Sequence, residues 1–400
     1  MLNSVITIAA FLLSLIVILV ASRKSLTIGI FFGAMTLGLL TLTPEIFLEN
    51  TIKSLTNIET LLLAIAVGLI PVLGGLLNES GLLDSMIKNY KFSRKSLILF
   101  SPAMLGLLPM PGGALFSAPL VDKAGGEKIS KIRKGSINVW FRHILHLIYP
   151  LAPTLIIASQ LAGLITYEVI LYLFPFFILT WLVGQYLLLG SSTELDSTEN
   201  ETKWKDFLVP IFIIAIAPVI DFLLRTFIGL KSLATLIGVS ASLILAIIVS
   251  KPSIKSFFEI SKKSKPWDFF FLILFIYLYQ GFFKVSGVSE LIEILEIPTW
   301  VFLIVISFTL GFLTGRTSTP LVILIPIFIA KFGSMSALDL ALMYYTTLLG
   351  YILSPIHPCV VFTADYYEID VKYLIKDSLT VTAISMIFGL LLYFLLYIFI

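Results

Sequence analysis

The stretch IYPLAP at 148–153 returns in altered form as LSPIHP at 353–358. Each stretch lies inside a long apolar run and carries the pattern Pro-x-x-Pro, and the second pair of prolines stands half a chain length after the first. Proline lacks the amide hydrogen that a helix interior needs, and its ring clashes with the preceding turn. The sequence therefore predicts two helices that break in the same way, one in each half of the chain.

The composition indicates a chain that resides in a lipid bilayer. Of its 400 residues 58% are hydrophobic and 13% are charged, and the mean hydropathy is +1.04. A soluble fold of this size could not bury so much apolar surface, whereas a bilayer accommodates it in spans of about 20 residues. The net charge of +3 does not indicate a nucleic-acid partner, because the basic residues lie in short loops between apolar runs. The single cysteine, Cys359, excludes an internal disulfide.

The apolar runs predict an all-α polytopic membrane protein. Two further runs, 97–121 and 299–330, are interrupted at their middles by LPMPGG (108–113) and LTGRTSTP (313–320). A Pro/Gly-rich break frees backbone groups that cannot face lipid, so each of these runs is predicted to be a re-entrant helical hairpin. The full spans are expected near residues 3–21, 26–43, 59–78, 136–160, 164–190, 207–224, 231–250, 268–283, 339–364 and 374–399.

A single shift along the sequence, the one that places Pro150 on Pro355, brings the features of the two halves into register. It also places Gly106 on Gly311 and the break of the first hairpin on that of the second. Each half then holds five transmembrane helices and one re-entrant hairpin, with the Pro-broken helix after the hairpin. Because five crossings are an odd number, the second half enters the membrane inverted, an arrangement found in many secondary transporters. The expected parts are a first inverted repeat, a polar linker and a second inverted repeat, at 1–190, 191–206 and 207–400.

The basic residues predict the orientation in the membrane. Most of the 27 Lys and Arg fall on one side of the expected spans, and cytoplasmic loops carry the excess of such residues. Both termini are therefore expected outside, and the first span is expected to be retained rather than cleaved as a signal peptide.

The second hairpin tip carries the first candidate site. Arg316 lies at bilayer depth, where a charge costs about 2.5–3.5 kcal/mol on insertion scales and is usually paired or functional. Its guanidinium is predicted to bind an anionic substrate, because it matches a carboxylate with two parallel hydrogen bonds; the alternative is a structural arginine that caps the carbonyls of the broken helix. Thr317, Ser318 and Thr319 are candidates for substrate binding, or they satisfy only the backbone of the hairpin.

The first hairpin tip offers backbone rather than side chains. Pro111, Gly112 and Gly113 are predicted substrate contacts, since glycine lets a ligand approach the backbone and amides at a helix start favour anions. The alternative is ordinary turn chemistry.

The segment WFRHILH at 140–146 adds Arg142, His143 and His146. Arg142 is a candidate for a second anion contact, or it extends to the lipid headgroups. His146 is a candidate proton carrier, because histidine titrates near neutral pH, whereas His143 is better explained as structural. A metal pair of the two histidines is not expected, because no carboxylate or cysteine cluster accompanies them.

The second Pro-x-x-Pro break holds His357, which is predicted to bind substrate because unwound segments hold substrate and coupling ion in transporters. The alternative is a buried histidine whose hydrogen bonds are satisfied. Ser354 and Asp365 join His146 as candidates for the coupling ion.

A hairpin followed by a Pro-interrupted span, in inverted duplicate, resembles the ion transporter superfamily, which includes gluconate permeases, citrate transporters and divalent-anion/sodium symporters. The strings GLLPMPGGALFSAP and SPIHPC are most similar to an uncharacterised prokaryotic membrane family related to the gluconate permeases. The dicarboxylate symporters carry Ser-Asn-Thr at both tips, whereas this chain has MPGG and RTST, so their ligand sites are not transferred to it.

The resemblance also implies an assembly and a movement. It implies a homodimer in a prokaryotic cell membrane, with elevator-type movement of a transport part against a fixed scaffold. The scaffold would comprise about 1–80 and 205–285, and the transport part about 97–190 and 298–400.

These features predict a secondary active transporter, not an enzyme, for a small organic anion such as a carboxylate, coupled to protons or sodium and without a further cofactor. Two alternatives stay open: an intramembrane metal-dependent enzyme that uses His143, His146 and His357, and a passive anion channel. A GxxxxGK[ST] loop is absent from the sequence, so primary pumping by this chain is not expected.

Overall fold

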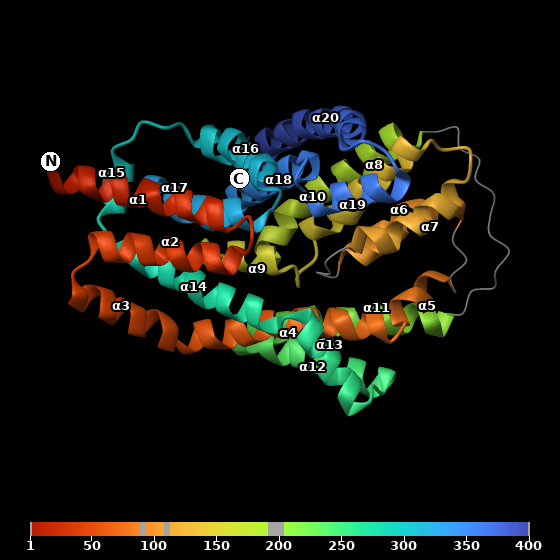
Figure 1. Cartoon of the computed structure of the whole chain (residues 1–400), viewed down its shortest axis with the longest axis horizontal. Coiled ribbons are helices and arrows are strands. Elements are labelled where there is room, and N and C mark those ends of the chain that lie inside the picture. Colours follow the sequence, from red (N-terminus) through yellow and green to blue (C-terminus); the bar gives the residue numbers. More distant parts are fainter. Residues whose placement is uncertain (1, 89–92, 108–112, 191–203, 399–400) are drawn as a thin grey trace.

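The computed structural model describes residues 2–88, 93–107, 113–190 and 204–398, and its regular elements are helices (Figure 1). Eight helical stretches of these residues are long and apolar enough to cross a bilayer. The chain is therefore a multi-pass membrane protein, as its composition predicts.

The first half of the chain forms ten α-helices, with a 3₁₀ turn before α9 and a π-helical end after α10. Their bounds are α1 (Leu2–Ala21), α2 (Leu26–Thr41), α3 (Pro44–Thr56), α4 (Ile58–Glu79), α5 (Leu82–Lys88), α6 (Arg94–Gly106), α7 (Gly113–Gly125), α8 (Lys131–Ile144), η1 (Leu145–Leu147), α9 (Pro153–Leu161), α10 (Thr166–Gly184) and η2 (Gln185–Leu189).

The second half also forms ten α-helices, with π-helical segments after α11 and before α16. Their bounds are α11 (Trp204–Leu223), η3 (Leu224–Ile228), α12 (Ser232–Ser250), α13 (Ile254–Ser264), α14 (Pro266–Val285), α15 (Val288–Glu293), η4 (Val301–Ile306), α16 (Ser307–Thr314), α17 (Ser318–Phe332), α18 (Ala337–Leu353), α19 (Pro358–Tyr367) and α20 (Val371–Ile398).

Three of the expected spans are shorter or divided. The run at 26–43 appears as α2, which has 16 residues. The run at 136–160 appears as α8, η1 and α9, and the run at 339–364 appears as α18 and α19. The linker predicted at 191–206 lies outside the described residues up to residue 203, and α11 begins at Trp204.

Two amphipathic helices, α3 and α13, occupy segments where no span is expected. The hydroxyl of Thr43 accepts a hydrogen bond from the amide of Ile46, and Pro44 follows at the first helical position, so α3 has a clear start signal. Both helices are too polar to cross a bilayer, and they pack against spanning helices, α3 against α14 and α13 against α4.

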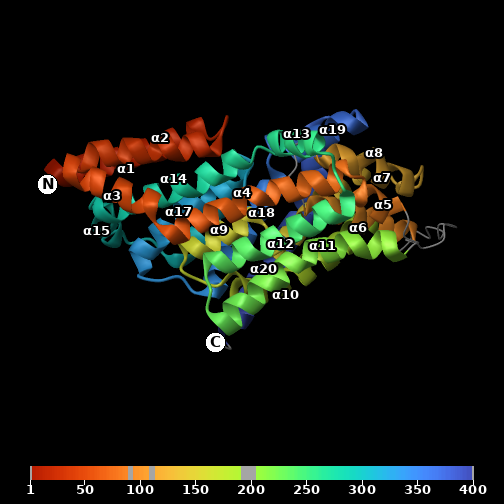
Figure 2. The same cartoon turned by 90° about the horizontal axis from the view of Figure 1, so that it is seen from below.

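The helices divide into two groups by their contacts. In one group, α4 packs against α12, α13 and α14, and α2 packs against α1 and α14. In the other, α18 packs against α10, α16 and α20, and α8 packs against α6, α7, α19 and α20. Figure 1 shows α3, α4 and α11–α14 along the lower side and α16, α18 and α20 along the upper side. In Figure 2, which is seen from below, the lower side faces the viewer.

Both Pro-x-x-Pro motifs break their helices, as predicted. The second proline of each motif stands at the first position of the helix that follows, α9 or α19, where its fixed φ suits the first turn. In each break the residue before that proline donates its amide to the carbonyl three residues back, Ala152 to Tyr149 at 3.0 Å and His357 to Ser354 at 3.2 Å. The two turns thus repeat one geometry at equivalent positions of the two halves.

A second repeated contact fixes the hairpins against the broken helices. A Cβ atom at Gly106 would collide with the carbonyl oxygen of Arg142, and one at Gly311 would collide with that of Thr347. The shift that superposes the two Pro-x-x-Pro motifs carries both members of the first pair onto those of the second. The backbone of α6 therefore lies against α8 as that of α16 lies against α18, and only glycine permits this approach.

We expect Gly311→Ala to lower the free energy of unfolding by about 1–3 kcal/mol, because the added methyl group meets a backbone carbonyl that cannot rotate away. Thermal unfolding of the detergent-purified protein measures the effect. Gly281→Ala is the matched control, since the only atom near its added methyl group is the hydroxyl oxygen of Ser54, which can move. Equal melting temperatures of the two variants would contradict the close packing of α16 on α18.

Candidate functional site

The broken helices bring an arginine, three histidines and a tyrosine together in the interior. The ring centroid of His143 lies 4.6 Å from that of His357, 5.6 Å from that of His146 and 5.1 Å from that of Tyr351. Arg142 precedes His143 on α8, and we call these residues the Arg–His cluster. It joins α8 and η1 of the first half to the end of α18 and the start of α19 in the second.

Arg142 is the buried charge of this cluster. The residue is 3% exposed, and Nη1 of its guanidinium has no hydrogen-bond partner among the residues that the structure describes. Among the described residues no carboxylate forms an ion pair with it, whereas a Cβ atom at Gly113, the first residue of α7, would collide with its Nη2. Arg142 therefore does not extend to the headgroups, which was one alternative from the sequence. A buried charge without a counter-charge is costly.

The three histidines are held differently. Nδ1 of His143 lies 2.6 Å from the carbonyl oxygen of Val139, and Nε2 of His146 lies 2.9 Å from that of Gly106. A carbonyl only accepts hydrogen bonds, so each of these ring nitrogens carries the proton. Both ring nitrogens of His357 are buried without a partner, although the residue is 0% exposed. His357 thus has hydrogen-bonding capacity that the described residues leave unused.

The ring of Tyr351 holds His357 and contacts His143. The rings of Tyr351 and His357 are 3.8 Å apart at an interplanar angle of 34°, and the Tyr351 hydroxyl lies 3.3 Å from Nε2 of His143. The same hydroxyl lies within electrostatic range of both Arg142 and Arg316. Tyr351 occupies the position in the second repeat that His146 occupies in the first, so the repeat shift was the signal that could have found it from the sequence.

The second hairpin tip closes on this cluster. Gly315 ends α16 in the left-handed conformation (φ 59°), and a Cβ atom there would approach the backbone nitrogen of His357 to 3.2 Å. Arg316 follows and is half-buried, and Thr317 lies with its hydroxyl 3.5 Å from that of Thr154 on α9. The tip predicted from the sequence therefore lies between the starts of α9 and α19.

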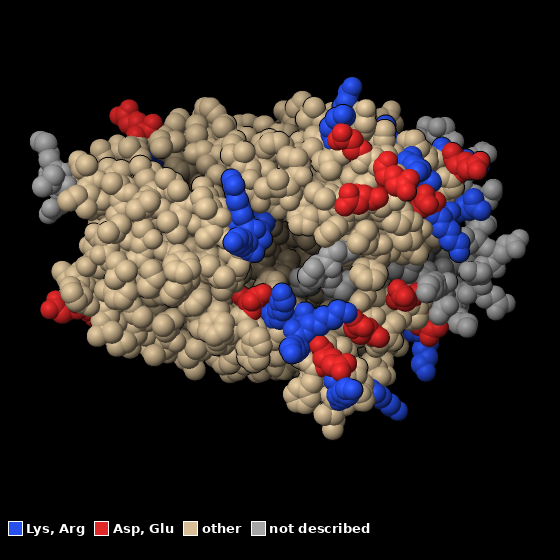
Figure 3. Space-filling model, in the orientation of Figure 1, with Lys and Arg blue, Asp and Glu red and all other residues tan. Residues whose placement is uncertain are grey.

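Several predicted polar groups near the tip have no partner. The hydroxyls of Thr319 and Ser354 are buried and unbonded, and Ser318 begins α17 in a half-buried position. Pro355 and Ile356 of the second break are exposed, so the break borders open space. Figure 3 shows the molecule hollowed between its two groups of helices.

One predicted coupling-ion residue does not join this arrangement. Asp365 is exposed, and it lies two helical turns beyond Pro358, which places it about 10 Å farther along α19. Pro111 and Gly112 lie outside the described residues, and only Gly113 of the first tip is placed.

The structure adds two residues that the sequence did not single out as site residues. Cys359 lies next to the cluster, since its side chain contacts that of Arg142. Asn138 donates to the carbonyl of Ala114 on α7 and to the hydroxyl of Thr363 on α19 at 3.0 Å, and thereby ties the first hairpin to both broken spans.

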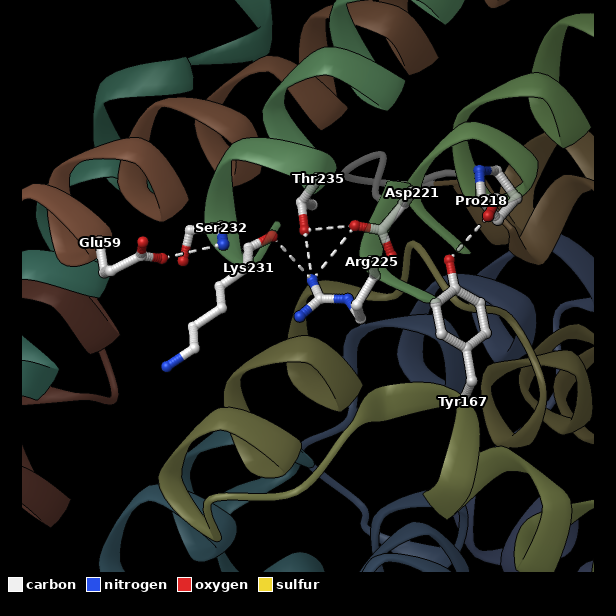
Figure 4. Close-up of polar contacts among 8 residues, drawn as sticks. All are labelled: Glu59, Tyr167, Pro218, Asp221, Arg225, Lys231, Ser232 and Thr235. Atoms are coloured by element: carbon white, nitrogen blue, oxygen red, sulfur yellow. Dashed lines mark hydrogen bonds and ion pairs between the residues drawn. The ribbon is translucent and has the colours of Figure 1, made fainter. Parts of the chain in front are cut away.

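A second polar cluster, shown in Figure 4, provides a contrast. The buried carboxylate of Asp221 accepts hydrogen bonds from Thr235 at 2.8 Å and from Arg225 at 3.2 Å. Tyr167 of α10 donates to the carbonyl of Pro218 at 2.8 Å and so links the two groups of helices. Here the opposite charges neutralise each other, which indicates a structural role.

The chain is similar to a protein family and to a solved transporter structure. A family model described as "Protein of unknown function (DUF401)" matches residues 5–396. Among solved structures, the crystal structure of the YdaH transporter of Alcanivorax borkumensis is similar, with a TM-score of 0.59 and 15% sequence identity over 88% of each chain. At this identity the likeness shows a shared fold. No curated protein matches the chain.

Removing one charge is expected to have a different effect on stability in each of the two clusters. Asp221→Asn leaves Arg225 without its counter-charge, and we expect it to lower the free energy of unfolding by about 3 kcal/mol. Arg142→Met removes a buried charge that has no counter-charge, so it is expected to leave the melting temperature unchanged or raised in the absence of ligand. A melting temperature of Arg142→Met as low as that of Asp221→Asn would show that Arg142 is structural.

Proposed function

The chain belongs to the DUF401 family, and we propose that it is a secondary active transporter for a small organic anion, a carboxylate. The observation that carries this proposal is the guanidinium of Arg142, buried among broken helices without a negative partner. Membrane proteins place charges at such depth where substrate or ions bind. A membrane-transporter fold, shared with YdaH, supports the same class of function.

Besides the charge of Arg142, the site contains several groups that could form hydrogen bonds with an anion. A carboxylate at Arg142 could accept two parallel hydrogen bonds from its guanidinium. His357 has free ring nitrogens, and the hydroxyls of Ser354 and Thr319 are unbonded. In our proposal a bound carboxylate satisfies several of these groups at once, together with Thr317 and Ser318 of the tip and the backbone of Pro111, Gly112 and Gly113.

The two arginines exchange the roles that the sequence suggested. Arg316 is half-buried at the tip, whereas Arg142 is almost fully buried behind it. We therefore assign Arg142 as the principal charge partner of the substrate and Arg316 as the contact at the entrance. Tyr351 lies between them and orients His357.

The proposed mechanism is alternating access by an elevator-type movement in a homodimer. The turns and glycine contacts that recur at equivalent positions of the two halves support two inverted repeats. The contact groups support a scaffold of about 1–80 and 205–285 and a transport part of about 97–190 and 298–400. The hydrogen bond from Tyr167 to the carbonyl of Pro218 joins the two parts, so it would have to break during the movement.

Coupling to protons or sodium completes the proposal. Ser354 is the best placed of the sequence candidates, since its hydroxyl is buried and unbonded at the break. His146 already bonds the carbonyl of Gly106, and Asp365 lies at the exposed end of α19. Sodium is therefore favoured over a proton carried by either of those two residues.

Ligand-dependent thermal stability of the purified protein tests the substrate class. We expect one small carboxylate to raise the melting temperature by mass action. At 100 times its dissociation constant, the ligand adds about 2.7 kcal/mol to the free energy of unfolding. The shift should be larger in sodium than in potassium. It should be lost in Arg142→Gln and kept in Arg23→Gln, which replaces an exposed arginine.

Uptake into proteoliposomes separates the proposal from its alternatives. A transporter concentrates the identified anion when an ion gradient is imposed, and its uptake saturates. Uptake that neither saturates nor depends on a gradient would indicate a passive channel. Uptake of neutral or cationic solutes, without uptake of any anion, would contradict the proposed substrate class.

A further inference from the structure

The thiol of Cys359 completes a set of metal-ligand atoms in the interior. One ring nitrogen of His143, one of His357 and Sγ of Cys359 all lie within 4.8 Å of one another. We propose that these three residues bind a transition-metal ion, with zinc or copper(I) as the class of ion. This site does not rest on the proposed transport function, and the histidine pair considered from the sequence, His143 with His146, is a different set.

His143 is oriented as a metal ligand. Its Nδ1 donates to the carbonyl of Val139 at 2.6 Å, so Nε2 is left with a lone pair. Ligating histidines usually donate their other ring N–H to a carbonyl or carboxylate, which fixes the tautomer and the ring orientation. Nε2 faces the interior, where the Tyr351 hydroxyl lies 3.3 Å away.

His357 supplies the second, independent observation. The residue is 0% exposed and both of its ring nitrogens are without partners among the described residues. A buried polar group in this state costs free energy unless something binds it. Its position before Pro358 fixes the backbone at the start of α19, and Cys359 lies two residues beyond on the same turn. A metal ion here would bridge α8 and α19 and would bind a ring nitrogen that has no hydrogen-bond partner among the described residues.

Two imidazoles and a thiolate are a ligand set for zinc or copper(I). Zinc ligands lie about 2.0–2.3 Å from the metal and hence about 3.5 Å from one another in a tetrahedron. The three atoms lie within 4.8 Å of one another, so side-chain rotations that shorten the longest separation by about 1 Å reach that spacing. Three protein ligands leave a fourth position open for water or an anion.

The charges around the site are those of Arg142 and the ligands themselves. The guanidinium of Arg142 lies beside the side chain of Cys359, so a thiolate at this position has a cation next to it. The thiolate in turn offsets the repulsion between guanidinium and metal. His146 adds no charge in its neutral form, in which Nε2–H donates to the carbonyl of Gly106. Arg316 lies at the hairpin tip, within electrostatic range of Tyr351.

Metal binding to the full-length purified protein tests the site directly. After treatment with chelator, the protein is loaded with zinc and its content is measured by elemental analysis. Cobalt(II) serves as the optical probe, because a cysteine ligand gives a thiolate-to-cobalt charge-transfer band. We expect about one ion per chain and a charge-transfer band that disappears in Cys359→Ser.

His146→Gln is the matched control, since this ring belongs to the same cluster but its Nε2 bonds the carbonyl of Gly106. His357→Gln and His143→Gln are expected to weaken cobalt binding at least tenfold, whereas His146→Gln keeps it. Melting temperatures of the metal-free variants confirm that each one folds, and Cys359→Ala replaces Cys359→Ser if the latter does not. Less than half an ion per chain in the parent protein, or equal binding by His357→Gln and His146→Gln, would overturn the proposal.

Discussion

A bilayer offers no hydrogen bonds to an exposed backbone, and this constraint organises the molecule. Wherever proline or glycine frees a carbonyl, the surrounding helices must enclose the break or water must reach it. Both breaks therefore lie within the same group of helices, and the second hairpin tip packs against the second break through Gly315. The enclosed break thereby becomes the one region where polar side chains can gather at depth.

Charge is treated in two different ways inside this protein. Asp221 and Arg225 neutralise each other beside Thr235, and the result is a rigid joint between helices. Arg142 is more deeply buried and lacks a negative partner among the described residues. Gly106 packs against the backbone carbonyl of Arg142 and Gly113 packs against its guanidinium, so both parts of the residue are fixed in position. A cluster built only for stability would not leave such a group unsatisfied.

Prediction from the sequence is strong for the helices and weak for the contacts between them. Apolar periodicity and paired prolines locate the spans and the breaks, because these depend on local chemistry and on the bilayer. The amphipathic helices α3 and α13 are not predicted from the sequence, because their polar residues resemble those of loops between spans. The meeting of His143 with His357 and Cys359 joins residues from opposite halves of the chain, and no local pattern encodes it. His143 looks structural from its neighbours in the sequence, and only its neighbours in space show otherwise.

The packing of Gly113 against Arg142 restricts how these two positions can change. The guanidinium occupies the volume that a side chain at position 113 would need, so a larger residue there is compatible only with a shorter one at position 142. Substitution at either position alone creates a collision or a void. Among divergent members of the family the two positions should accordingly covary, and a lineage that gives up the arginine is released from the glycine as well. Two positions that lie 29 residues apart in the sequence are thus expected to change as a pair.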